Sequence, residues 1–84
     1  MSYSVRIKAS AVKALKRIAA DDRRRIVEAI DRLARQPFAG TVLKGEYTGL
    51  RRLRVGRYRV VYEVLERQLV VLVVRVGHRR DVYH

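Results

Sequence analysis

The sequence contains no cysteine, and its 84 residues include one proline and one phenylalanine. Without cysteine the chain can form neither a disulfide framework nor a thiolate metal site. It also lacks an apolar run of about 18 residues, and no signal peptide precedes the first predicted strand. We therefore expect one small cytoplasmic domain spanning residues 1–84, without membrane association.

Acidic residues are scarce, because eight Asp and Glu stand against twenty Lys and Arg, for a formal net charge of +12. A field of this sign attracts polyanions such as nucleic acid, an anionic membrane or an acidic protein. Most of the cations are arginine, whose planar guanidinium suits phosphate and carboxylate. Alternatively, the excess of basic residues reflects only the base composition of the genome, and these residues lie on a solvated surface without a partner. Clustering of the charges after residue 50 disfavours this alternative.

Several kinds of catalytic chemistry lack their residues. The chain has no glycine-rich phosphate loop and no nucleophile elbow, and its two histidines are His78 and the terminal His84. Two imidazoles are too few ligands for a zinc site. The acids of the last third of the chain sit among arginines and do not suggest a glycosidase pair. We expect neither a metal nor a cofactor.

Hydrophobic periodicity predicts an α+β fold with the element order β-α-α-β-β-β. Alternating apolar and polar residues indicate strands, and apolar residues recurring at three and four positions indicate two amphipathic helices. Short spacing between the helices implies a hairpin, packed on a small twisted, mainly antiparallel sheet. The predicted strands are Ser2–Lys8, Leu50–Val55, Tyr58–Leu65 and Leu69–Val76, and the predicted helices are Ala11–Ala20 and Arg23–Arg35.

Local residues mark the ends of these elements. Ser10 stands where a side chain would cap the first helix, and Asp21 or Asp22 can cap the second and stabilise its positive end. Pro37 stops the second helix. The last strand is apolar on both faces except for Arg75, so it is the candidate for a central strand.

Arginines gather on one face of the strands that follow residue 50. Strand parity places Arg52 and Arg54 on the same side, and Arg59 returns to that region after one tight turn. Converging arginines repel one another, so stability alone does not explain them. They can bind nucleic-acid backbone or stabilise negative charge in a phosphoryl-transfer transition state. His78 and Tyr83 add groups that can move protons or stack on bases.

The chain resembles the RelE branch of the RelE/ParE toxin superfamily in three motifs. These are Leu43-Lys44-Gly45, the run from Gly49 to Tyr62 and the run from Val73 to Tyr83. The opening strand and helical hairpin are also in the expected places, so the resemblance covers essentially the whole chain. It implies a toxin that enters the ribosomal A site and cleaves the mRNA there. The RNA 2′-hydroxyl would attack the adjacent phosphate and leave a 2′,3′-cyclic phosphate.

The resemblance also implies roles for individual residues. Arg52 and Arg54 match the basic positions of the strand before the Gly-x-Tyr-Arg turn, and Arg59 matches the arginine that holds the scissile phosphate. Arg79 matches the later arginine that stabilises charge or assists the leaving group. Tyr83 matches the terminal tyrosine that stacks on the nucleotide.

Further basic residues complete the expected RNA-binding surface. They are Lys44, Arg51, Arg57, Arg75 and Arg80. Arg80 is also the alternative to Arg79 if the alignment slips by one residue. The identity of the general base stays open, because arginine is always protonated. His78 is the candidate for proton transfer, and a structural histidine is the alternative.

Two other functions remain as alternatives. ParE toxins share the fold but inhibit DNA gyrase, and a non-catalytic RNA-binding protein would also be basic. ParE toxins generally lack the set of basic residues and a tyrosine that this chain shares with the RelE branch, so the resemblance favours RelE; the set is Arg52, Arg54, Arg59, Arg79 and Tyr83. The expected partners are the ribosome, mRNA and a small acidic, RelB-like antitoxin whose helix or tail covers the arginines. DNA would be contacted only indirectly, through the antitoxin.

Overall fold

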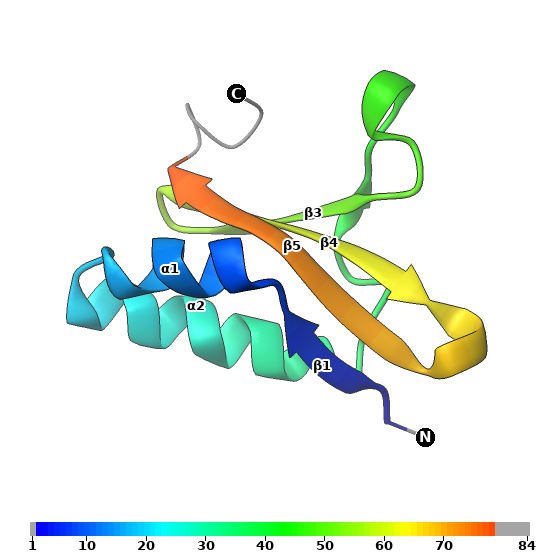
Figure 1. The fold of residues 1–84 in the computed structure, drawn as a ribbon, viewed down its shortest axis with the longest axis horizontal. Coiled ribbons are helices and arrows are strands. Elements are labelled where there is room, and N and C mark those ends of the chain that lie inside the picture. The colour runs from blue at the N-terminus through cyan, green and yellow to red at the C-terminus, as the bar shows by residue number, and fades with distance from the viewer. Residues whose placement is uncertain (1, 79–84) are drawn as a thin grey trace.

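The computed structural model describes residues 2–78 and shows two helices packed on one face of a five-stranded sheet (Figure 1). The arrangement confirms the predicted α+β class with a helical hairpin on a mixed sheet. The strands are β1 Ser4–Ile7, β2 Thr41–Val42, β3 Arg51–Val55, β4 Tyr58–Leu65 and β5 Val70–His78. The helices are α1 Ala9–Lys16 and α2 Ala20–Arg32, and short 3-10 helices cover Gly45–Tyr47 and Glu66–Gln68.

The strands lie in the order β1-β5-β4-β3-β2. β1 is parallel to β5, and the other neighbouring pairs are antiparallel, so the sheet is mainly antiparallel as predicted. β5 lies between β1 and β4, which confirms its interior position. The sequence pattern does not predict β2, because its two residues, Thr41 and Val42, are too few to show a period.

Both helices begin and end earlier in the chain than expected. Ser10 lies inside α1, whose N-cap is Lys8, and no side chain caps this helix. Ala19 is the N-cap of α2, so Asp21 and Asp22 lie in its first turn and favour its positive end without capping it. The capping predictions were wrong because alanine, which has the highest helix propensity, precedes each apolar stripe and extends the helix toward its N-terminus.

The core lies between the helices and the sheet. Val73 and Val76 are three residues apart, yet both belong to it, because a β-bulge shifts the alternation of β5. Val61 is opposite Arg75 while Tyr62 is opposite Val73, which leaves one extra residue in β5. The buried core residues are Ala11, Leu15, Ile26, Ile30, Leu33, Val60, Tyr62, Val71, Val73 and Val76.

Tyr62 joins the loop that follows α2 to the middle of the sheet. Its buried hydroxyl donates a hydrogen bond to the backbone oxygen of Pro37 and accepts one from the backbone N–H of Gly40, both at 2.8 Å. Burial raises the pKa of Tyr62 above its usual 10.0. A Cβ on residue 40 would lie 2.7 Å from the hydroxyl oxygen, so the contact requires glycine. These bonds hold the chain leading into β2 against the sheet.

A candidate nucleic-acid interface on one face of the sheet

The alternation of β4 separates the two faces of the sheet. Val60 and Tyr62 pack against the helices, so Arg59, Val61 and Glu63 point to the other side. We call this side, which no described helix covers, the arginine face. Its charged strand residues are Arg6, Arg52, Arg54, Arg59, Glu63 and Arg75.

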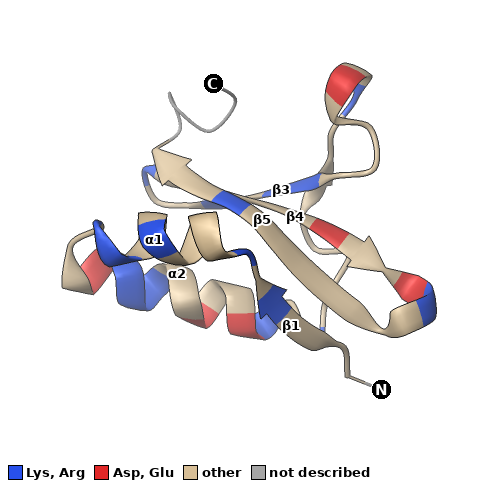
Figure 2. Ribbon diagram, in the orientation of Figure 1, with Lys and Arg blue, Asp and Glu red and all other residues tan. Residues whose placement is uncertain are grey.

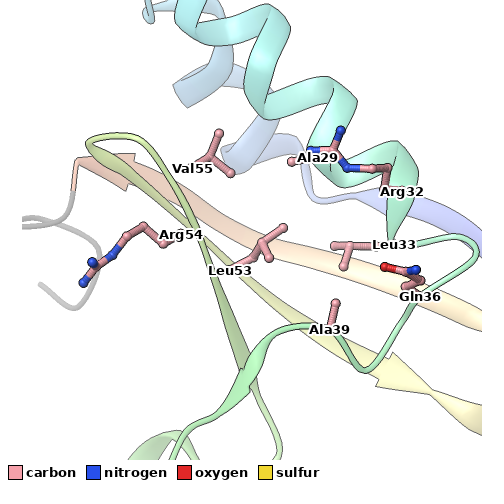
Figure 3. Close-up of a pocket in the computed structure, with 8 residues that line it drawn as sticks. All are labelled: Ala29, Arg32, Leu33, Gln36, Ala39, Leu53, Arg54 and Val55. Atoms are coloured by element: carbon pink, nitrogen blue, oxygen red, sulfur yellow. The ribbon is translucent and has the colours of Figure 1, made fainter.

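Three arginines are neighbours on this face. Arg54 is directly opposite Arg59 across β3 and β4, and Arg52 is opposite Val61. The Cβ atoms of directly opposite residues are about 4.5–5.5 Å apart. The register therefore confirms that Arg52, Arg54 and Arg59 share one face. Figure 3 shows the same alternation along β3, where Leu53 points toward α2 and Arg54 points away from it.

The electrostatics of the arginine face are unfavourable for folding. Opposed like charges such as Arg54 and Arg59 destabilise a sheet. Within residues 2–78, Arg52, Arg54 and Arg59 form no ion pair, and the ion pair found there joins Arg24 and Asp21 at 2.9 Å on α2. The Nε atom of Arg59 is buried and finds no acceptor in the described part of the chain. An unsatisfied buried donor costs about 1–3 kcal/mol, and a phosphate oxygen is a suitable acceptor.

The charged residues are distributed unevenly between the elements (Figure 2). Arg75 on β5 is exposed and opposite Val61, so it extends the arginine face. Arg57 is exposed in the turn between β3 and β4, and Lys44 is exposed before the first 3-10 helix. The exposure of these three side chains is compatible with the predicted RNA contacts.

Arg51 is placed differently from its neighbours. Its guanidinium donates hydrogen bonds to the backbone oxygens of Gly40 at 2.9 Å and Phe38 at 3.3 Å. It also stacks over the Phe38 ring, 5.0 Å from the centroid. Arg51 thus reinforces the attachment of the loop after α2, and its contact with RNA stays a prediction.

His78 lies on the helix side of the sheet. It is opposite Tyr58, and the two rings pack edge to face with centroids 6.0 Å apart. Tyr58 packs on the core, whereas Gly77 is opposite Arg59. The bulge in β5 causes this placement, since unbroken alternation from Val73 would put His78 on the arginine face. The geometry favours the structural alternative for His78. Arg79, Arg80 and Tyr83 lie outside the described residues.

Glu63 is a residue of the arginine face for which the sequence suggested no role. It is half-buried, lies opposite Leu72, and follows Val61 on the same side of β4. Among the described strands it is the acid on this face. Glu63 is an even number of residues after Arg59, so strand alternation places both on the same face. This spacing is the sequence feature that could have identified Glu63.

The opposite side of the sheet has a groove of about 210 Å³ between α2 and β3 (Figure 3). Its lining is mainly apolar, and its polar residues are Arg32 at the end of α2, Gln36 after the helix and Arg54 on β3. β2 pairs only with Arg51 and Arg52, so the outer edge of β3 beyond them has no described strand beside it. The groove therefore lies next to a strand edge with free hydrogen-bonding groups.

Two kinds of feature are not found in residues 2–78. No three His, Asp or Glu side chains come together to hold a metal ion there. No helix in that range is long and apolar enough to cross a membrane.

The chain is similar to known proteins over nearly its whole length. The matching family model is the ParE toxin of type II toxin–antitoxin systems, over residues 5–83. Toxin RelG of Mycobacterium tuberculosis is 33% identical over 99% of this chain and 98% of its own length.

Two solved structures are similar in both sequence and fold. The toxin–antitoxin complex RelBE2 of Mycobacterium tuberculosis contains a chain that is 30% identical with a TM-score of 0.88, covering 94% of this chain and 100% of that one. The archaeal RelE–RelB complex of Pyrococcus horikoshii contains one that is 34% identical with a TM-score of 0.80, covering 98% of this chain and 100% of that one.

Proposed function

We propose an endoribonuclease function for this chain, which belongs to the RelE/ParE toxin superfamily and is a toxin of a type II toxin–antitoxin system. The proposed substrate is ribosome-bound mRNA. The reaction uses the nucleophile of the RNA itself. The 2′-oxygen forms a bond to the adjacent phosphorus, and the bond from phosphorus to the 5′-oxygen breaks. The products are a 2′,3′-cyclic phosphate and a free 5′-hydroxyl.

The observation that carries the proposal is the convergence of Arg52, Arg54 and Arg59 on one face. During the attack, negative charge builds up on the non-bridging phosphate oxygens. Preorganised cationic donors stabilise that charge more than they stabilise the ground state. The Nε of Arg59 is buried and unsatisfied, so this donor is already desolvated before RNA binds. We therefore propose that Arg59 holds the scissile phosphate. Arg52 and Arg54 stabilise the same developing negative charge on its oxygens.

The two remaining catalytic assignments follow from the family motif in the sequence. Arg79 is proposed to stabilise charge or assist the leaving group, with Arg80 as its alternative, and Tyr83 to stack on the nucleotide. Both roles suit the chemistry of the side chains, because arginine binds phosphate and tyrosine offers an aromatic surface to a base.

We also propose an acidic antitoxin as the protein partner. The two similar structures are complexes of RelE-type toxins with RelB-type antitoxins, and the net charge of +12 favours an acidic partner. Such a segment would neutralise the arginine face. The groove beside Arg32 on α2 is a second surface suited to an apolar segment with acidic residues.

Inhibition of DNA gyrase is the second candidate, because the family model that matches carries the ParE name. The two functions differ in their biochemical outcome. Purified toxin should cut mRNA bound in ribosome complexes and leave the supercoiling activity of gyrase unchanged. Intact mRNA together with blocked supercoiling would replace the nuclease assignment with the gyrase one.

A further inference from the structure

The proposed reaction needs a group that takes the proton from the 2′-hydroxyl, and the arginine face has few candidates. Arginine stays protonated and cannot act as a base. His78 is on the other side of the sheet, against Tyr58. Of the acids in the described strands, Glu63 projects from the arginine face.

We propose that Glu63 is the general base that activates the 2′-hydroxyl, an inference that rests on the proposed nuclease function. Glu63 follows Val61, the partner of Arg52, by two residues on the same face. Diagonal neighbours of this kind are about 7–8 Å apart. Arg59 is four residues away, roughly 13 Å along the strand. A nucleotide whose phosphate contacts Arg52 and Arg59 would thus have its sugar within reach of the carboxylate.

The surroundings of Glu63 leave its oxygens able to accept a proton. It is half-buried, and its neighbour across the sheet is the apolar Leu72. Within residues 2–78 Glu63 forms no ion pair, since the ion pair found there joins Arg24 and Asp21 on α2. Arg52, Arg54 and Arg59 therefore leave this carboxylate available.

The proton transfer balances as follows. The carboxylate of Glu63 takes the proton of the 2′-hydroxyl while the new oxygen–phosphorus bond forms. The departing 5′-oxygen takes a proton from water, and the carboxylic acid of Glu63 returns its proton to the solvent. The net reaction consumes no water and changes no oxidation state.

The test compares single-turnover cleavage of mRNA in ribosome complexes by the wild-type toxin, Glu63→Gln and Glu66→Gln. Glutamine keeps the size and hydrogen bonding of glutamate but does not accept a proton at neutral pH. Glu66 lies in the exposed turn after β4, so its variant makes the same charge change away from the arginine face. We expect Glu63→Gln to lower the cleavage rate by about 10²–10⁴-fold, and Glu66→Gln to retain the wild-type rate.

Measurements of RNA binding and of folding separate a catalytic role of Glu63 from a structural one. Removing a negative charge from this face should leave RNA affinity unchanged or increase it, and circular dichroism should show the same fold. If Glu63→Gln cleaves at the wild-type rate, Glu63 is not the general base, and the nuclease function still stands. The same conclusion follows if its slower cleavage is matched by weaker RNA binding. A wild-type toxin that cleaves no mRNA overturns the nuclease function and this inference with it.

Discussion

Replacing Tyr62 by phenylalanine tests how the loop after α2 is attached to the sheet. The substitution keeps the aromatic ring in the core and removes only the hydroxyl. That hydroxyl bonds both the backbone oxygen of Pro37 and the backbone N–H of Gly40 at 2.8 Å. Two buried backbone groups therefore lose their partners in the variant.

The expected effect is large for a chain of this size. Each unsatisfied buried group costs about 1–3 kcal/mol, so with two such groups we expect the free energy of unfolding to fall by roughly 2–6 kcal/mol. A domain of 84 residues has a total free energy of unfolding of roughly 4–13 kcal/mol, at about 0.05–0.15 kcal/mol per residue. At about 4–8 °C per kcal/mol, the midpoint of thermal unfolding should fall by roughly 8 °C or more.

Urea unfolding followed by circular dichroism measures this change, with Tyr3→Phe as the matched control. Tyr3 is half-buried and packs edge-on against Phe38 with ring centroids 6.5 Å apart. Its hydroxyl has no part in the bonds to Pro37 and Gly40. If Tyr62→Phe were as stable as Tyr3→Phe, the hydroxyl would not be what holds the loop.

Three further results follow from the structure. The free energy of unfolding should decrease above pH 10. The reason is that Tyr62 ionises near pH 10.0 in the unfolded chain, while burial raises its pKa in the folded chain. Tyr62→Phe should lack this part of the decrease when denaturation is measured as a function of pH. Arg59→Ala should cut ribosome-bound mRNA about 10²–10³-fold more slowly with its fold retained, whereas Arg67→Ala, in an exposed turn, serves as the charge-matched control; equal rates would remove Arg59 from the site. His78→Gln should keep the wild-type pH–rate profile, and a changed profile would restore His78 as a proton-transfer group.

Strand parity was sufficient to predict the arginine face. β4 begins and ends at the predicted residues, Tyr58 and Leu65, and the turn before it brings Arg59 back opposite Arg54. Alternation within two strands joined by a tight turn is a local property, so spacing alone determines it. The shared face of these arginines therefore needed no knowledge of the rest of the fold.

The position of His78 depended on a feature that the sequence pattern does not reveal. The bulge in β5 adds one residue and reverses the alternation after Val73, so Val76 enters the core and His78 follows it to the helix side. An apolar run such as that of β5 shows no alternation from which the bulge could be located.

Arg51 shows a second limit of sequence patterns. It looks like one more cation beside Arg52, but its partners, Phe38 and Gly40, lie more than ten residues earlier in the chain. Contacts of this kind form only when the loop after α2 folds back on the sheet. They separate a structural arginine from the arginines available to a ligand.

The chemistry of the mRNA end tests the central claim most directly. Ribosome complexes carrying a defined mRNA would be incubated with purified toxin, and the new RNA ends would be mapped and their phosphates identified. The arginine face and the proposed 2′-hydroxyl attack predict cuts within the ribosome-bound codon, with a 2′,3′-cyclic phosphate on one product and a 5′-hydroxyl on the other. Intact mRNA, or products with a 5′-phosphate, would contradict the account.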